Sequence, residues 1–304
     1  MNKDLARKFS PGQTTCAGCA VSLVVRTVLN SIDYPVVVTN ATGCMEVTST
    51  IYPNTSWKVP YIHSTFVNTG ATISGIETAY KALKNKGEIK TKKPVKFVAF
   101  GGDGGTYDIG LQALSGALER HHDFLYICYD NGAYMNTGNQ RSGATPLGAD
   151  TETTPFGKKS LGKNSTRKDI VSIVAGHDIP YVATANIGFL DDLKEKVKKA
   201  VEMKGPKFIL VFSPCVNQWK YPTDQTIKIA KLATETNFWP LYEIENGRYK
   251  INYQSRKKIS IEEFYKTQGR FSHLFKKKNK KEIFKDIQEE IDGEWRELEE
   301  RSKK

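Results

Sequence analysis

Short apolar runs alternate with helical patterns along much of the chain. An apolar run at 97–100 is followed by a glycine-rich turn at 101–105, a helical stripe between 109 and 118, and a second apolar run at 124–129. The apolar residues of the helical stripe are Ile109, Leu111, Leu114 and Leu118. Strand, turn, helix and strand in this order are typical of the βαβ unit of a parallel sheet. The glycine turn therefore lies where such sheets bind ligands, at the carboxyl ends of the strands.

The same alternation recurs on both sides of this unit. It predicts strands at 36–38, 181–183 and 208–212, and helices at 21–29, 69–83, 168–175 and 190–203. Residues 132–162 lack hydrophobic periodicity, and so long an irregular stretch in a compact domain is usually functional. We therefore predict an α/β fold with a mostly parallel sheet and helices on both faces.

The C-terminal part of the chain differs in kind. Residues 216–304 contain aromatic residues in short segments and then a helix whose apolar stripe runs from Ile283 to Leu298. No second α/β pattern follows. We predict a cofactor-binding α/β domain at 1–215 and a C-terminal extension at 216–304, which wraps the domain or contacts another subunit.

Composition narrows the class of protein. The chain has 304 residues and a net charge of +12, but no nucleic-acid-binding motif accompanies the lysines, so nucleic-acid binding is not favoured. A basic surface also suits an acidic electron carrier. The apolar runs are too short to span a bilayer, and the N-terminus lacks the apolar core of a signal peptide. We expect a cytoplasmic protein without membrane contact.

Two polar residues end successive predicted strands. Asp103 lies in the glycine turn, and Asn131 follows the strand at 124–129. Neighbouring parallel strands end at the same edge, so these side chains should lie side by side and offer oxygen ligands to a hard cation. Backbone N–H groups of the turn would lie near a phosphate. The alternative is an ordinary glycine turn without a ligand.

Four of the five cysteines fall where predicted strands end or nearby. Cys16 and Cys19 form a C-x-x-C, whereas Cys44 and Cys215 each follow a strand. The four thiolates could hold one iron–sulfur cluster or one zinc ion, and their spacing does not separate the two. A redox dithiol plus two buried cysteines is the other interpretation. Cys128 lies within a strand and is expected in the core.

Several motifs together resemble one family. They are CAGCA at 16–20, NATGCMEV at 40–47, GGDGGTYDIGLQALSGALER at 101–120 and YDNGAYMNTG at 129–138. The chain resembles the β subunit of pyruvate:ferredoxin oxidoreductase (pyruvate synthase), of the 2-oxoacid:ferredoxin oxidoreductase family. The similarity covers nearly the whole chain. It implies the thiamine-diphosphate-binding fold.

The resemblance also implies roles for individual residues. Those that match the ligands of the proximal [4Fe-4S] cluster are Cys16, Cys19, Cys44 and Cys215. Those that match the Mg²⁺ ligands are Asp103, Asn131 and, through its carbonyl group, Ala133. Asn136 matches an asparagine near the reacting carbon. Residues expected to contact thiamine diphosphate are Gly43, Met45, Gly102, Asp103, Gly104, Gly105 and Asn131.

The implied activity is thiamine-dependent oxidative decarboxylation of pyruvate to acyl-coenzyme A and CO₂, or the reverse, with electrons passed through the cluster to ferredoxin. The chain has no room for a second, pyrimidine-binding domain and no ferredoxin-type cysteine run. The expected partners are therefore α, γ and ferredoxin-like δ subunits, arranged as a dimer of heterotetramers. Alternatives are another 2-oxoacid (branched-chain, aromatic or oxalate), a non-redox thiamine-dependent decarboxylase subunit, and a zinc-stabilised binding module.

Some positions depart from the family pattern or stay unassigned. Ala20 stands where the family often has Gly, and Gly132 where it often has Glu. His63 has no assigned role. Thr106 either contacts the diphosphate or begins the helix. The pair His121-His122 is expected to cap a helix end.

Overall fold

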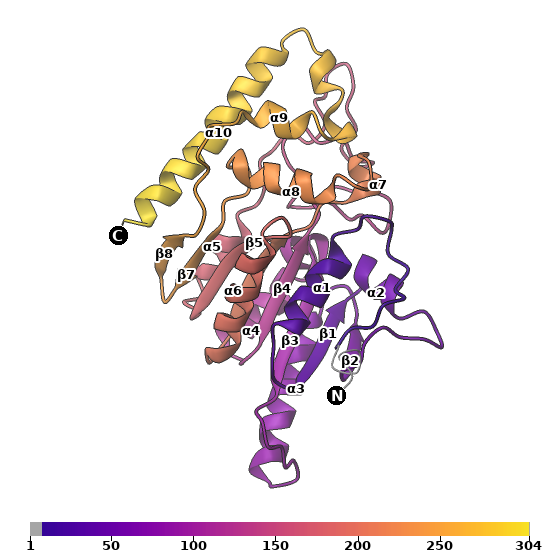
Figure 1. Ribbon diagram of the computed structural model, residues 1–304, viewed down its shortest axis with the longest axis vertical. Helices are drawn as coiled ribbons and strands as arrows, with labels where there is room; N and C mark the ends of the chain where they lie inside the picture. Colours follow the sequence, from indigo (N-terminus) through magenta and orange to yellow (C-terminus); the bar gives the residue numbers. More distant parts are fainter. Residues whose placement is uncertain (1–7, 304) are drawn as a thin grey trace.

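An eight-stranded sheet organises the computed structural model, which describes residues 8–303 (Figure 1). The strand order is β2-β1-β3-β4-β6-β5-β7-β8, and β1 to β6 are parallel, whereas β7 and β8 are antiparallel. The strands are β1 Val36–Ala41, β2 Tyr61–Ser64, β3 Lys96–Gly102, β4 Leu125–Asp130, β5 Tyr181–Asn186, β6 Lys207–Phe212, β7 Tyr242–Glu245 and β8 Arg248–Ile251.

Helices cover both faces of this sheet (Figure 1). The α-helices are α1 Val21–Asn30, α2 Cys44–Ser49, α3 Thr69–Asn85, α4 Leu111–Glu119, α5 Ile170–Ala175, α6 Leu190–Glu202, α7 Val216–Trp219, α8 Thr226–Glu235, α9 Ile261–Tyr265 and α10 Lys280–Arg301. Helix α1 packs against α6, and α3 against α4. Every residue of β4, β5 and β6 is buried, as expected for parallel strands covered on both sides. The predicted fold class is confirmed.

The segment that follows β6 extends the same sheet. Strand β7 pairs with β5, and β8 pairs with β7 across the turn at Asn246-Gly247. Asn-Gly is a strong hairpin signal, but the flanking strands have only four residues each, and the sequence analysis missed them. Helix α10 packs on β8 and α9, and its residues Ile287 and Ile291 join the main hydrophobic core. The domain boundary at residue 215 stays a prediction.

One predicted helix begins differently. The glycine turn runs into a π-helix, η1, at Gly104–Asp108, and α4 begins only at Leu111. A π-turn holds one residue more than an α-turn, so it shifts the helical register. The expected placement of Ile109 on the buried stripe is wrong, since its side chain is 50% exposed, whereas Leu114 and Leu118 are buried.

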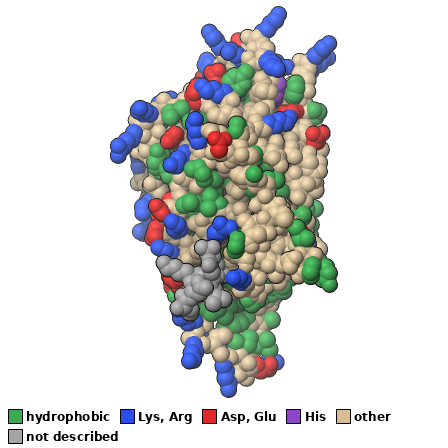
Figure 2. Space-filling view, turned by 45° about the vertical axis from the view of Figure 1, so that its right-hand side comes forward, with side chains coloured by type: hydrophobic (Ala, Val, Ile, Leu, Met, Phe, Trp, Pro, Cys, Tyr) green, Lys and Arg blue, Asp and Glu red, His purple; other side chains and the backbone are tan. Residues whose placement is uncertain are grey.

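Lys and Arg side chains are spread over the surface in Figure 2, with several at each end of the molecule. One end carries the loop that follows α3, and the opposite end carries the C-terminal helices (Figure 1). Among the residues described, none of the helices is long and apolar enough to cross a membrane.

Candidate functional site

The predicted cation ligands lie side by side at the carboxyl edge of the sheet. Asp103 follows β3, Asn131 follows β4, and the pairing of Gly102 with Tyr129 aligns the two strand ends. The backbone N–H of Asn131 donates to Asp103 Oδ1 at 3.3 Å. Asp103, Asn131 and Ala133 are 1%, 5% and 3% exposed. Three residues that can offer oxygen ligands are therefore enclosed at one point.

The side-chain amide of Asn131 lies between an oxygen of Asp103 and the carbonyl oxygen of Ala133. The Asn131 side-chain oxygen lies 2.9 Å from Asp103 Oδ1 and 2.9 Å from the Ala133 carbonyl oxygen. Octahedral ligands at about 2.0–2.1 Å from Mg²⁺ stand about 2.9 Å apart, so the donor set fits such an ion. Without a cation, a half-turn of the amide would place its NH₂ group there, where it donates to both oxygens.

A loop residue holds the other oxygen of Asp103. Ser142 Oγ donates to Asp103 Oδ2 at 2.6 Å. Burial, and then the neighbouring charge of Asp130, raise the pKa of Asp103 well above its usual range. A divalent cation would offset both effects, because it favours the ionised carboxylate. The carboxyl group is thus oriented for a cation.

The loop at 132–162 closes over this site and is held by short contacts. Isolated bridges join Tyr134 to Gln140 and Phe156 to Leu161. Thr145 Oγ1 donates to the Gly132 carbonyl oxygen at 2.7 Å. Gly104 must lack a side chain, since a Cβ there would lie 2.4 Å from Tyr134 Cε1. The irregular stretch therefore packs closely against the glycine turn.

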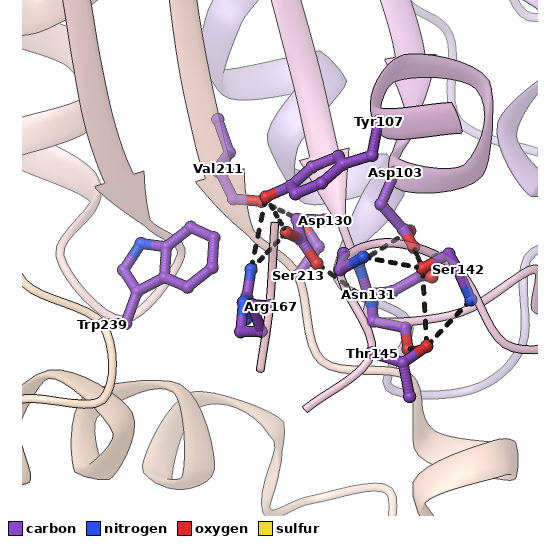
Figure 3. Close-up of polar contacts among 12 residues, drawn as sticks. Asp103, Tyr107, Asp130, Asn131, Ser142, Thr145, Arg167, Val211, Ser213 and Trp239 are labelled. Carbon is purple, nitrogen blue, oxygen red and sulfur yellow. Dashed lines mark hydrogen bonds and ion pairs between the residues drawn. The ribbon is translucent and has the colours of Figure 1, made fainter. Parts of the chain in front are cut away.

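An ion pair between the buried Asp130 and the half-buried Arg167 fixes the turn that carries Asn131 (Figure 3). Asp130 is 1% exposed. Its Oδ2 accepts hydrogen bonds from Arg167 Nη2 and from the Tyr107 hydroxyl, each at 2.6 Å. Its Oδ1 accepts from the Gly132 N–H at 3.0 Å. All of these contacts restrain the backbone on either side of Asn131.

We expect Asp130→Asn to destabilise the chain strongly. The substitution leaves Arg167, whose side chain is 19% exposed, without its counter-charge. Breaking a fully buried pair costs about 3–5 kcal/mol, and the loss should lie at the lower end of that range because solvent screens part of the remaining charge. Urea unfolding at neutral pH measures the loss. Asp191→Asn is the matched control, because Asp191 pairs with Lys194 at 2.8 Å but is 96% exposed, and exposed pairs contribute about 0–1 kcal/mol. Equal losses in the two variants would contradict this account.

The C-x-x-C is attached to the segment that follows Cys215. Thr226 Oγ1 donates to the Gly18 carbonyl oxygen at 2.7 Å, and Asn217 Nδ2 donates to Cys16 Sγ at 3.1 Å. Cys16 and Cys19 therefore lie on the same side of the molecule as Cys215, although some two hundred residues separate them along the chain.

Cys44 completes a group of neighbouring thiols. Burial, and then the charges of Cys215, Cys19 and Cys16, raise the pKa of Cys44 to about 12. Burial, Cys19 and Cys16 raise the pKa of Cys215 to about 11. Within residues 8–303, however, no three Cys, His, Asp or Glu side chains are drawn together as one metal ion requires. The thiols are neighbours, but they do not form a compact mononuclear site.

Comparisons with known proteins agree with this geometry. Residues 41–211 match the family model described as "Thiamine pyrophosphate enzyme, C-terminal TPP binding domain". The chain is 51% identical over 306 residues to pyruvate synthase subunit PorB of Thermotoga maritima, which covers 97% of this chain and 94% of that protein. The chain belongs to the pyruvate synthase PorB family. The family resemblance found from the sequence is thereby confirmed, and with it a thiamine-pyrophosphate-binding subunit of a larger enzyme.

Two further similarities concern the substrate class and the fold. The ketoisovalerate oxidoreductase subunit VorB of Pyrococcus abyssi is 47% identical over 270 residues, covering 88% of this chain and 86% of that protein. A solved 2-oxoglutarate:ferredoxin oxidoreductase from Magnetococcus marinus superposes with a TM-score of 0.59 at 20% identity, covering 75% of this chain and 80% of that one. The similarity to this solved structure supports the fold alone. The relatives of this chain include subunits named for two substrates, pyruvate and ketoisovalerate.

The residues expected near the thiamine rings of a PorB-type subunit differ in how exposed they are. Asn136 is exposed and has no hydrogen bond to any residue of 8–303. Met45 is fully buried in the hydrophobic core. A Cβ on Gly43 would lie 2.8 Å from the Tyr129 hydroxyl. That hydroxyl and the amide of Asn40 are buried at the carboxyl edge of the sheet, beside the Gly43 turn.

The residues to which the sequence analysis assigned no definite role make contacts within the chain. The Thr106 hydroxyl donates to the Gly102 carbonyl oxygen at 2.7 Å, so it stabilises the π-turn. His63 Nε2 lies 2.8 Å from Thr42 Oγ1, and its Nδ1 lies 3.5 Å from Glu46. The backbone N–H groups of His121 and His122 donate to the Leu118 and Ala117 carbonyl oxygens at the end of α4, and His121 is in the left-handed conformation. The ring of His122 contacts Glu77 at 3.1 Å.

Several residues of the site escaped the sequence analysis. They are Tyr107, Asp130, Ser142 and Arg167. Asp130 carried a usable signal, because it precedes Asn131 at the end of a buried strand and a buried carboxylate needs a partner. Ser142 and Arg167 carried none, since the path of an irregular loop does not follow from hydrophobic periodicity.

Proposed function

We propose that this chain is the thiamine- and cluster-binding subunit of a 2-oxoacid:ferredoxin oxidoreductase whose substrate is pyruvate. The observation that carries the proposal is the position of the Asn131 side-chain amide, 2.9 Å from Asp103 Oδ1 and from the Ala133 carbonyl oxygen at the carboxyl edge of the sheet, so that three oxygens converge when the amide oxygen faces a cation. They would hold Mg²⁺ against the diphosphate group. When bound, thiamine diphosphate supplies a carbanion that attacks the keto group and an electron sink for decarboxylation.

The four neighbouring thiols support a [4Fe-4S] cluster as the electron acceptor. Each zinc–sulfur bond is about 2.3 Å long, so a zinc site needs four closely gathered sulfurs. No such compact group is formed within residues 8–303. A four-iron cluster binds one cysteine at each iron and so accepts a wider arrangement. The proposed ligands are Cys16, Cys19, Cys44 and Cys215.

Partner subunits are required to complete this site. Asn136, expected near the reacting carbon, is exposed. Apolar side chains on neighbouring elements are exposed as well, with Tyr52 at 93%, Ile51 at 50% and Ile62 at 45%. Figure 2, which turns the α2 and β2 side forward, shows apolar groups on that surface. Exposed apolar side chains on adjoining segments are expected where another subunit binds. We propose an α subunit there, with γ and ferredoxin-like δ subunits completing a dimer of heterotetramers that uses coenzyme A and ferredoxin.

We expect the assembled complex to prefer pyruvate. The relative with 51% identity is a pyruvate synthase subunit, whereas the ketoisovalerate oxidoreductase subunit is 47% identical. The measurement is kcat/KM for ferredoxin reduction with coenzyme A and either pyruvate or 2-oxoisovalerate. A preference for pyruvate of about tenfold or more is expected, because 2-oxoisovalerate carries an isopropyl group in place of the methyl group of pyruvate, and a single methylene already changes binding by about 10–200-fold in a fitted pocket. A preference for the branched substrate would contradict the assignment to pyruvate and leave the chemistry intact.

A further inference from the structure

A buried arginine from the C-terminal extension lies beside the turn that carries Asn131. Arg270, in the 3₁₀-helix η2 at Gly269–Phe271, is 3% exposed, and its Nε donates to Gln268 Oε1 at 2.9 Å. Its Nη2 is buried without a hydrogen-bond partner, and burial lowers the pKa of this guanidinium to about 9. None of the ion pairs formed within residues 8–303 includes it. A buried charge outside any ion pair is costly, and an anion bound nearby would offset that cost.

Trp219 connects this arginine to both halves of the proposed site. The Arg270 guanidinium lies 3.7 Å from the centre of the Trp219 ring, a cation–π contact. The indole N–H donates to the Asn131 carbonyl oxygen at 2.8 Å, and the backbone N–H donates to the Cys215 carbonyl oxygen at 3.1 Å. One buried residue therefore contacts the backbone of a proposed cation ligand and of a proposed cluster ligand.

Gly132 leaves room for this arrangement. A Cβ at this position would stand 3.0 Å from Arg270 Nη1, and its φ of +78° favours glycine. A side chain at 132 would push against the guanidinium and strain the turn. The guanidinium thus lies against the backbone between Asn131 and Ala133, two of the three proposed cation ligands.

We propose that Trp219 and Arg270 act together as positioning residues that hold the Asn131 turn and Cys215 in a fixed relation. The inference rests on the proposed function, because the anionic diphosphate and the cysteine thiolates would supply the counter-charge that the chain lacks around Arg270. The bound cofactor would stabilise the charged guanidinium of Arg270. Arg270 and the stacked ring of Trp219 in turn stabilise the Asn131 turn, which binds the cofactor.

The test uses the assembled complex, freed of cofactor by dialysis against EDTA. Isothermal titration with thiamine diphosphate and Mg²⁺ gives the Kd, and thermal unfolding gives Tm. Trp219→Phe keeps the ring and removes the indole N–H, which should raise Kd on the order of tenfold. Arg270→Met keeps the length of the side chain and should raise Kd similarly. Arg270→Lys restores the charge and should recover most of the affinity.

Trp239→Phe is the matched control. Trp239 is also buried, and its indole N–H donates to the Ala185 carbonyl oxygen at 2.9 Å. The phenyl ring would still lie under Arg167, whose guanidinium is 4.7 Å from the indole. The control should therefore lose a similar hydrogen bond and lower Tm without raising Kd.

The outcomes separate the inference from the proposed function. If Trp219→Phe and Arg270→Met lower Tm but bind the cofactor like the wild type, their role is structural only and the inference is overturned. The same holds if Arg270→Lys binds no better than Arg270→Met, a comparison that stays available if Trp219→Phe does not fold. A wild-type complex that binds no thiamine diphosphate overturns the proposed function and the inference with it.

Discussion

Replacing Asp103 with asparagine should raise the Kd for Mg²⁺ and thiamine diphosphate by more than about a hundredfold and abolish turnover at ordinary cofactor concentrations. The loss of residues behind the metal ligands alone typically costs about 10–100-fold, and this substitution removes a charged ligand. The carboxylate is pre-oriented by Ser142 at 2.6 Å and by the Asn131 N–H at 3.3 Å, whereas the neighbouring carboxylate of Asp130 is already held by Arg167 and Tyr107.

A carboxylate at the opposite end of the sheet controls for general damage. Asp123 precedes β4 and pairs with Lys207, which is 3% exposed. Asp123→Asn should therefore lower Tm without changing the Kd for the cofactor. Titration of both variant complexes with thiamine diphosphate and Mg²⁺ decides the matter. If D103N bound them with wild-type affinity, Asp103 would not be a cation ligand.

Replacing Cys215 with serine should remove the iron of one [4Fe-4S] cluster from the complex and stop electron transfer to ferredoxin. Serine keeps the shape of the side chain but is a poor ligand for iron, which prefers thiolate in such clusters. Iron content, visible absorbance and the electron paramagnetic resonance spectrum of the reduced complex measure the loss. Thiamine diphosphate should still bind, because Asp103 and Asn131 are intact.

Cys128 provides the control for this substitution. It is fully buried in β4 and belongs to the hydrophobic core, as its position within a strand predicted. Cys128→Ala should leave the iron content unchanged. If C215S kept the full iron content, or if the wild-type chain held zinc in place of iron, the assignment of the four cysteines would be wrong.

The parallel sheet explains why part of the site could be predicted from the sequence. Asp103 and Asn131 end strands that are adjacent in the sheet, and strand ends of a βαβ unit lie together. The proximity of these two side chains therefore followed from the apolar pattern and the two polar residues. The same logic placed Cys44 and Cys215 at this edge, although β3 and β4 lie between β1 and β6.

The remaining contacts depend on segments whose path has no periodic signal. Ser142 comes from an irregular loop, and Arg270 from a short 3₁₀-helix in the C-terminal extension. The contact between Trp219 and Asn131 joins residues 88 positions apart. The π-helix at Gly104–Asp108 also escaped prediction, because an inserted residue changes which side of the helix faces the core.

The central claim is that this chain binds thiamine diphosphate and a redox cluster at one edge of its sheet and connects them. The most direct test adds pyruvate and coenzyme A, without ferredoxin, to the anaerobic wild-type and C215S complexes and follows visible absorbance. Rapid bleaching is expected in the wild type and none in C215S, although clusters in other subunits stay intact. Equal bleaching in both complexes would show that electrons leave the thiamine site by a route that avoids this chain's cysteines, and would contradict the account.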